Sequence, residues 1–300
     1  MPGGGYTDIH THGAVGCSYD SADYGQVAAA LDFHHQHGTS DTLLSLVSAP
    51  PEQLAARLRR LRSTLSGHHV ISGVAIHGVH VEGPFLAPAR AGAHAPQALR
   101  EPSPSAVETL LEAGEGILRQ VTLAPELPGA MEAIDRFSEA GVLVAVGHTA
   151  ADYDITAEAF DRGASLLTHA LNAMPGLEHR APGPLGAALD RDHVGIEVIA
   201  DGVHVHRVLI RTLFAAAPDR VILVTDSMAA AGLGDGTYRL GGLDVEVRDG
   251  IPLLADARTL AGSTLTMDVA VGTAIAAGVP AQQAKAAAST VPARFLGFDH

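Results

Sequence analysis

The sequence predicts an α/β protein whose strands close into a (β/α)8 TIM-like barrel, and two observations indicate this fold. Short runs rich in Val, Ile and Leu alternate with helical segments along most of the chain, which is typical of parallel strands joined by helices. Eight such strands fit into about 230 residues, which favours a closed barrel, although an open doubly wound sheet shows the same alternation. We expect residues 1–300 to form one barrel domain.

The expected elements follow one another in strand–helix order. The strands are the β-branched or leucine-rich runs at 6–10, 42–47, 73–82, 120–124, 142–148, 165–169, 194–199 and 221–226. Helical segments are expected between them at 26–37, 52–65, 106–115, 130–140, 152–162 and 206–216. Gly38, Gly141 and Gly163 stand where three of these helices should end, because glycine accepts the backbone turn that terminates a helix.

The pattern changes after the last expected strand. Residues 237–250 alternate polar and apolar side chains around Gly241 and Gly242, which predicts a hairpin inserted after the barrel strands. The chain then returns to helix at 266–277 and 281–289, and Gly278 and Pro280 separate these two segments.

The composition narrows the classes of partner and location. The chain has 33 acidic and 19 basic residues, and a formal net charge of −14 has the wrong sign for a nucleic-acid or anionic-membrane binder. No apolar run approaches the roughly 20 residues that span a bilayer. The first five residues do not combine a basic with an apolar segment, and the single cysteine, Cys17, agrees with a reducing compartment. We therefore expect a cytoplasmic protein.

Histidines and carboxylates fall at the carboxyl ends of five expected strands. This end of a barrel is where barrel enzymes keep their active sites. Alternate residues of a strand point to the same face, so the two histidines at the end of the first strand can bind one metal ion. In chain order, the polar residues are His10 and His12, Glu82, His148, His169 and Asp226.

Each of these residues has a simpler explanation when taken alone. Glu82 precedes Gly83 and Pro84 and could be a surface residue before a turn, and His148 or His169 could be a core histidine bonded to the backbone. Their coincidence at one end of the barrel favours a site, and a carboxylate at the end of the apolar 221–226 run is costly to bury without a partner.

The expected chemistry is metal-assisted hydrolysis. A divalent ion lowers the pKa of water and polarises a carbonyl group, while a carboxylate, here Asp226, moves the proton to the leaving nitrogen. Zinc is the first choice for the ion, and iron, manganese and cobalt accept the same histidine and carboxylate ligands. Competing catalytic motifs are absent from the sequence, since it has neither a Gly-x-Ser-x-Gly elbow nor a Gly-rich phosphate loop ending in Lys.

A set of motifs runs in one order through nearly the whole chain. They are DIHTHG at 8–13, HVEGPF at 80–85, VTLAPE at 121–126, GHT at 147–149, THALNAMP at 168–175, ADGVH at 200–204, VTD at 224–226 and LAGS at 260–263. With these motifs the sequence resembles the N-acetylglucosamine-6-phosphate deacetylases of the amidohydrolase superfamily. The resemblance implies hydrolysis of the acetamide of an amino-sugar phosphate.

The resemblance also implies a role for individual residues. Glu82, His148 and His169 would bind the main metal ion, Asp226 would act as acid and base, and His10 and His12 could hold a second ion, so that one or two ions per chain stays open. The residues implied in binding the substrate are Ala93 and His94 at the sugar, Asn172, Ala173, Arg180, Asp201 and His204 at or beside the phosphate, and Leu260, Ala261 and Gly262 near the acetyl group. A homodimer is expected, because the phosphate site of this family can extend across a dimer interface.

One departure from the family concerns the ends of the chain. Family members carry strands before the Pro-Gly segment and after the Pro-Ala-Arg helix that form a small β-sandwich, and this chain starts and stops at those segments. We therefore expect a barrel without the sandwich. Two other functions stay open: an amidohydrolase acting on another N-acetyl sugar phosphate or a cyclic amide, and a sugar-phosphate-binding protein without turnover.

Overall fold

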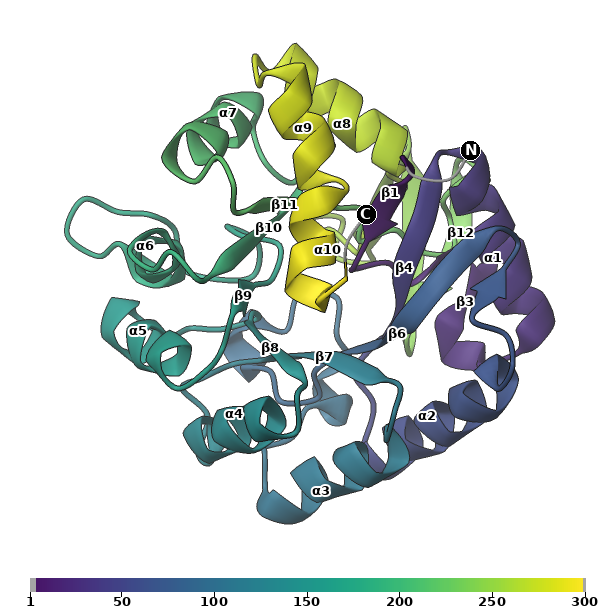
Figure 1. Cartoon of the computed structure of the whole chain (residues 1–300), viewed down its shortest axis with the longest axis horizontal. Coiled ribbons are helices and arrows are strands. Elements are labelled where there is room, and N and C mark those ends of the chain that lie inside the picture. Colours follow the sequence, from purple (N-terminus) through teal and green to yellow (C-terminus); the bar gives the residue numbers. More distant parts are fainter. Residues whose placement is uncertain (1–3, 299–300) are drawn as a thin grey trace.

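The computed structural model describes residues 4–298, and it confirms the predicted barrel (Figure 1). Eight parallel strands lie in the order β1-β4-β6-β7-β8-β9-β10-β11. Beyond the ends of the first and last strands, the Asp226 amide donates to the His10 carbonyl and the His12 amide donates to the Ser227 carbonyl, each at 2.8 Å. These bonds close the sheet. Residues 1–3, which begin the segment considered for a secretory signal, lie outside the described residues.

The barrel strands agree with the expected runs but end earlier at the site. They are β1 (Tyr6–Asp8), β4 (Thr39–Leu46), β6 (Val74–Glu82), β7 (Leu118–Leu123), β8 (Leu143–Val146), β9 (Leu166–Leu167), β10 (Gly195–Ile199) and β11 (Val221–Val224). Strands β1, β8, β9 and β11 each end two residues before the functional side chain that the sequence placed inside the strand. Those side chains are His10, His148, His169 and Asp226, and they belong to the loops at the barrel mouth.

Helices form a ring outside the strands, as expected (Figure 1). They are α1 (Tyr24–Gln36), α2 (Pro51–Leu65), α3 (Pro104–Ala113), α4 (Ala130–Glu139), α5 (Tyr153–Asp161), α6 (Gly183–Leu189), α7 (Arg207–Ala216) and α8 (Met267–Ala276). Gly38, Gly141 and Gly163 follow their helices with φ of +87°, +74° and +118°, as the sequence predicted.

Two helices were not predicted as separate elements. The first is α6, whose seven residues include two glycines and a proline and so carry no clear apolar period. The second is α10 (Thr290–Leu296): the segment expected as one helix over 281–289 ends early, at α9 (Ala281–Ala287), and the chain then starts again. Short turns of 3-10 helix cover Tyr19–Ser21, Pro88–Arg90 and Pro96–Ala98.

The insertion after the last barrel strand is a three-stranded antiparallel sheet and not only a hairpin. It contains β12 (Gly236–Leu240), β13 (Leu243–Arg248) and β14 (Ile251–Leu254). Its buried side chains Val245 and Val247 belong to a small apolar cluster with Val47 and Met228. Smaller elements are β5 (Val70–Ile71), which pairs with β6, and the β2 (Gly13–Ala14) and β3 (Cys17–Ser18) pair.

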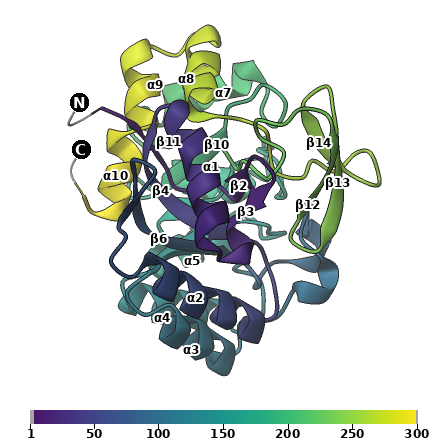
Figure 2. The same ribbon diagram turned by 90° about the vertical axis from the view of Figure 1, so that its right-hand side faces the viewer.

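The insertion and the last helix lie at opposite ends of the molecule. Figure 2 shows β12, β13 and β14 on one side and α10 on the other. Because the functional residues follow the carboxyl ends of the strands, the insertion lies on their side of the barrel. Residues 4–298 contain no flanking β-sandwich. No helix within these residues combines the length and hydrophobicity that crossing a bilayer requires.

Candidate metal centre and active site

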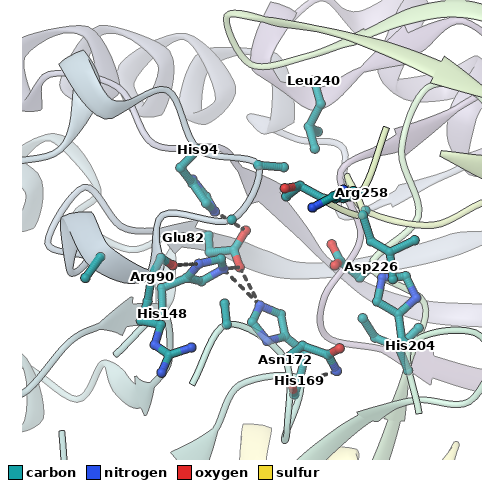
Figure 3. A pocket seen from close by; sticks show the side chains of 18 residues that line it. Glu82, Arg90, His94, His148, His169, Asn172, His204, Asp226, Leu240 and Arg258 are labelled. Atoms are coloured by element: carbon teal, nitrogen blue, oxygen red, sulfur yellow. Dashed lines mark hydrogen bonds and ion pairs between the residues drawn. The ribbon is translucent and has the colours of Figure 1, made fainter. Parts of the chain in front are cut away.

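Three metal-ligand side chains meet at the barrel mouth (Figure 3). Glu82 Oε1 lies 3.2 Å from His148 Nε2 and 3.1 Å from His169 Nε2, and the two imidazole nitrogens are 3.0 Å apart. All three residues are buried. Ligand atoms on a tetrahedron around zinc, at about 2.0–2.1 Å from the ion, would be roughly 3.3 Å apart. The triangle therefore has nearly the size that one ion requires.

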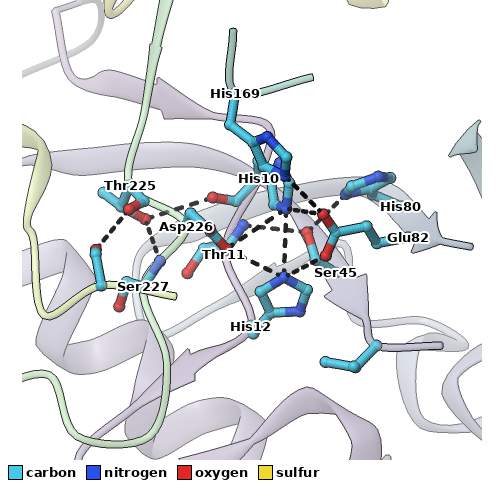
Figure 4. A network of polar contacts seen from close by, with 12 residues as sticks. His10, Thr11, His12, Ser45, His80, Glu82, His169, Thr225, Asp226 and Ser227 are labelled. Carbon is cyan, nitrogen blue, oxygen red and sulfur yellow. Dashed lines mark hydrogen bonds and ion pairs between the residues drawn. The ribbon is translucent and has the colours of Figure 1, made fainter. Parts of the chain in front are cut away.

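A second group of ligand atoms lies beside the first (Figure 4). His10 Nε2 and His12 Nε2 are 3.3 Å apart, and Asp226 Oδ1 lies 3.6 Å and 3.3 Å from them. Glu82 contacts both groups, because its Oε1 is 3.5 Å from His10 Nε2 and its Oε2 is 3.1 Å from His12 Nε2. This carboxylate is placed to bridge two ions.

The backbone turns sharply where the strands deliver these side chains. His148, His169 and Asp226 have φ of +46°, +27° and +48°, a region that residues other than glycine rarely adopt. Each such residue costs about 1–3 kcal/mol, and strain of this kind clusters at functional sites. For Asp226 the surrounding backbone holds the turn: its amide donates to His10 and its carbonyl accepts from the Ser263 amide at 2.7 Å.

The orientation of the imidazoles suits a metal ion. In His10, His12, His148 and His169 the nitrogen that faces the carboxylates is Nε2. The opposite nitrogen of His148 is 2.9 Å from the Arg90 carbonyl, which accepts only from a protonated Nδ1. Because a neutral imidazole carries one proton, this bond leaves Nε2 of His148 with a free lone pair toward Glu82. The donor set therefore fits a divalent cation.

The buried carboxylates of the site also need positive charge close to them. Burial alone would raise the pKa of Asp226, but His10 and a hydrogen bond with His12 lower it to about 2. Burial opposes a charge on His12, whereas hydrogen bonds with Asp226 and Glu82 raise its pKa to about 9. In the absence of an ion, positive charge on the neighbouring histidines offsets the burial of these carboxylates, and a bound cation would supply that charge while the imidazoles are neutral.

A cavity of about 350 Å³ opens above the metal ligands. Gly262 contributes to its wall with φ of +62°, and a Cβ at this position would lie 3.0 Å from the Asp226 carbonyl oxygen, so only glycine fits without strain. The predicted residues that line the cavity are Glu82, Ala93, His94, His148, His169, Asn172, Ala173, His204, Asp226, Leu260 and Gly262.

Three predicted substrate-binding residues lie elsewhere. Arg180 is exposed on the loop before α6 and does not line this cavity. Ala261 is fully buried beneath the loop that carries Leu260. Asp201 lines a neighbouring cavity of about 270 Å³, and its Oδ2 is 2.6 Å from His204 Nδ1. Asp201 therefore orients His204, which lines both cavities.

Histidines outside the site differ in burial. His68 and His69 are exposed. His34 is buried, and its Nε2 lies 3.3 Å from the Gly13 carbonyl and 3.4 Å from Thr11 Oγ1. Burial lowers the pKa of His34 to about 4.

Several residues at the site were missed by sequence reasoning. Arg90 and Arg258 line the cavity but lie outside the recognised motifs. Asp8 is buried at the end of β1, where its Oδ2 accepts from the Thr225 hydroxyl at 2.6 Å. Glu197 is fully buried on β10 and contacts His10. Glu197 had a sequence signal, because it is the one charged residue of the apolar run 194–199.

Comparison with known proteins agrees with this geometry. The sequence profile described as "Amidohydrolase family" matches residues 1–300. An N-acetylgalactosamine-6-phosphate deacetylase of Escherichia coli O157:H7 is 38% identical over 98% of this chain and 78% of its own length. An N-acetylglucosamine-6-phosphate deacetylase of Vibrio furnissii is 35% identical over 100% of this chain and 74% of its own.

A solved structure of a related protein has the same fold. A variant of N-acetyl-D-glucosamine-6-phosphate deacetylase from Mycobacterium smegmatis, in complex with N-acetyl-D-glucosamine-6-phosphate, superposes with a TM-score of 0.93 and 40% identity. The match covers 98% of this chain and 77% of that one. The chain therefore belongs to the amidohydrolase family, in the branch that contains the N-acetylglucosamine-6-phosphate deacetylases.

Proposed function

We propose that the chain hydrolyses the acetamide of N-acetylglucosamine 6-phosphate to glucosamine 6-phosphate and acetate. The observation that carries this proposal is the meeting of Glu82, His148 and His169 beside Asp226 on the floor of an open cavity. The relatives named for this reaction, at 35% identity or above, support the same substrate class.

Glu82, His148 and His169 would hold one divalent ion, for which zinc is our first choice. When bound, such an ion supplies a Lewis acid that lowers the pKa of water and polarises a carbonyl. Asp226 is an anion at neutral pH and accepts the proton of the attacking water. The same carboxyl then delivers that proton to the amide nitrogen as the carbon–nitrogen bond breaks. Elemental analysis of the purified protein would separate zinc from iron, manganese and cobalt.

Acetate release with and without the phosphate tests the substrate. We expect N-acetylglucosamine 6-phosphate to be hydrolysed with a kcat/KM at least about 10²-fold above that of N-acetylglucosamine, because charge-assisted hydrogen bonds to phosphate contribute about 1.5–3 kcal/mol each. Metal-free protein, prepared with a chelator, serves as the control. Equal rates for the two sugars would contradict the phosphate pocket, and binding without acetate release would favour a protein without turnover.

The 4-epimer is a second candidate substrate. One of the relatives, at 38% identity, is an N-acetylgalactosamine-6-phosphate deacetylase. The two sugars differ only in the orientation of the C4 hydroxyl. Comparison of kcat/KM for both sugar phosphates, measured by acetate release on the same preparation, would decide which of them the cavity prefers.

The phosphate has two sources of positive charge within one chain. Arg90 and Arg258 line the cavity, whereas Arg180 does not. We expect Arg258→Met to raise KM for the phosphorylated sugar by about tenfold with little change in kcat, since the lost contact stabilises ground and transition states equally. The KM for the unphosphorylated sugar should not change.

Arg180→Met is the matched comparison for this prediction. We propose a homodimer in which Arg180 reaches the phosphate of the partner subunit's cavity, and in that case this variant also raises KM. If only Arg180→Met raises KM, the phosphate does not use Arg258, and the assignment of Arg258 is wrong.

A further inference from the structure

Glu197 is a buried carboxylate at the centre of the barrel that the proposed reaction does not use. It lies on β10, whose five residues are all buried, and its side chain is 0% exposed. The adjacent residues Ile196 and Val198 are apolar and point to the opposite face of the strand. An ionisable side chain in such a place is costly to bury unless its oxygens are bonded.

Both oxygens of Glu197 have partners. Oε2 is 3.1 Å from His10 Nδ1 and accepts a weaker bond from the His169 amide at 3.4 Å. Oε1 accepts from Gln120 Nε2 at 2.9 Å, and Gln120 is itself fully buried on β7. Glu197 therefore bonds to the backbone of His169, a ligand of the first group, and to the imidazole of His10, which belongs to the second group.

The bond to His10 fixes the imidazole in one form. A carboxylate accepts hydrogen bonds, so Nδ1 of His10 must carry the proton that it shares with Glu197. Nε2 is then the nitrogen with the free lone pair, and it faces Glu82 Oε1 and Asp226 Oδ1 at 3.5 and 3.6 Å (Figure 4). The ring is also packed edge to face against His80, with centroids 4.6 Å apart, so it has little freedom to turn.

We propose that Glu197 is the positioning residue of a second metal position formed by His10, His12 and Asp226, with Glu82 as the bridge. The proposal rests on the proposed metal-dependent function and on the second ion that the family resemblance implies, and it adds that Glu197 orients the His10 imidazole toward that ion. Glu197 contacts no substrate atom. Removal of the hydrogen-bond partner of a metal-binding histidine typically lowers metal affinity about 10–100-fold.

Glu197→Met tests this role, because methionine has nearly the same volume but accepts no strong hydrogen bond. The full chain is stripped of metal and titrated with Zn²⁺ in the presence of a chromophoric chelator, which gives the number of ions and both dissociation constants. We expect two ions in the unchanged protein. In Glu197→Met the weaker dissociation constant should rise about 10–100-fold and the tighter one should stay the same.

Glu197→Gln is the conservative variant. Its amide oxygen can still accept from His10, and Gln120 can turn its own amide, whose buried Oε1 otherwise has no partner among residues 4–298. This variant should recover most of the affinity that methionine loses. If only side-chain volume mattered, methionine and glutamine would give equal metal constants.

Asp8→Asn is the matched control for general loosening of the barrel. Asp8 is another buried carboxylate at the same barrel end, but it accepts hydrogen bonds from Thr225 and from the backbone amide of His10 and not from an imidazole nitrogen. This variant should lower the unfolding temperature and leave both zinc constants unchanged. An Asp8→Asn variant that loses the second ion to the same extent would mean that Glu197 acts through overall stability, and the proposal would fail.

A double-mutant cycle keeps the test decisive if Glu197→Met folds poorly alone. In His10→Ala protein the second ion is already lost, so adding Glu197→Met or Glu197→Gln should not change the remaining zinc constant. The proposal is overturned if the unchanged chain binds one ion, or if Glu197→Met binds both ions as tightly as the unchanged chain. Neither result affects the proposed deacetylation, which acetate release tests separately, whereas protein that binds no metal at all would refute both.

Discussion

Asp226→Asn is expected to lower turnover by about 10²-fold or more while the ion of Glu82, His148 and His169 is retained. Asparagine has the shape of aspartate but cannot accept a proton from water and pass it on. The three ligands of that ion are supplied by other strands, so their geometry does not depend on the charge of Asp226. Acetate release at saturating substrate, measured with metal content on the same sample, checks both parts.

Asp20→Asn is the control for this prediction. Asp20 is a largely buried carboxylate near His12, but its Oδ1 pairs with Arg57 at 2.8 Å and does not line the cavity. Its replacement should change stability and leave turnover of the folded, metal-loaded protein within a few-fold of normal. An Asp226→Asn protein that turns over at the normal rate would remove Asp226 from the mechanism.

The carboxylates that follow two strands could be predicted from sequence because the residue type changes at one position. Strand β6 is predominantly apolar until Glu82, and the run before Asp226 is equally apolar, so a carboxylate at the end of each stands out. Parallel strands in a barrel deliver such residues to one mouth. The barrel and the meeting of these side chains therefore follow from local patterns combined with one rule of topology.

The turns that aim the side chains could not be predicted in this way. His148, His169 and Asp226 come at the ends of β-forming runs, and although His and Asp adopt a positive φ more readily than most residues, the runs themselves do not mark where the turn occurs. The turn is imposed by tertiary contacts, such as the pairing of the Asp226 backbone with His10 and Ser263. Local propensity therefore extends these strands by two residues, although the structure ends them earlier.

The contribution of Arg258 to the cavity depends on a long-range arrangement. This residue follows the three-stranded sheet β12–β14, and its position is set by how that sheet packs against Val47 and Met228 at the mouth. The sequence of this segment has no periodic pattern from which that packing could be predicted. The resemblance alone implies a role for Arg180, and the course of the loop before α6, which keeps this residue out of the cavity, has no signal in the local sequence.

His148→Ala is expected to remove the ion that the Glu82 group holds, so that metal content falls by about one ion per chain and activity falls with it. Zinc sites of this kind use three protein ligands, and the change leaves only two of them. It also deletes the bond from Nδ1 to the Arg90 carbonyl that orients the ring. Elemental analysis after exhaustive dialysis measures the loss directly.

His94→Ala separates loss of a ligand from loss of a neighbour. His94 Nε2 is 3.3 Å from Glu82 Oε2, and its ring lies against that of His148 with centroids 4.5 Å apart, so its removal opens the same region. His94 nevertheless is not one of the three side chains that converge on one point. We expect His94→Ala to keep its metal and to bind substrate less tightly. Full metal occupancy in His148→Ala would show that the ligand set has been misassigned, because a Glu–His pair without His148 cannot hold zinc at the affinity that survives dialysis.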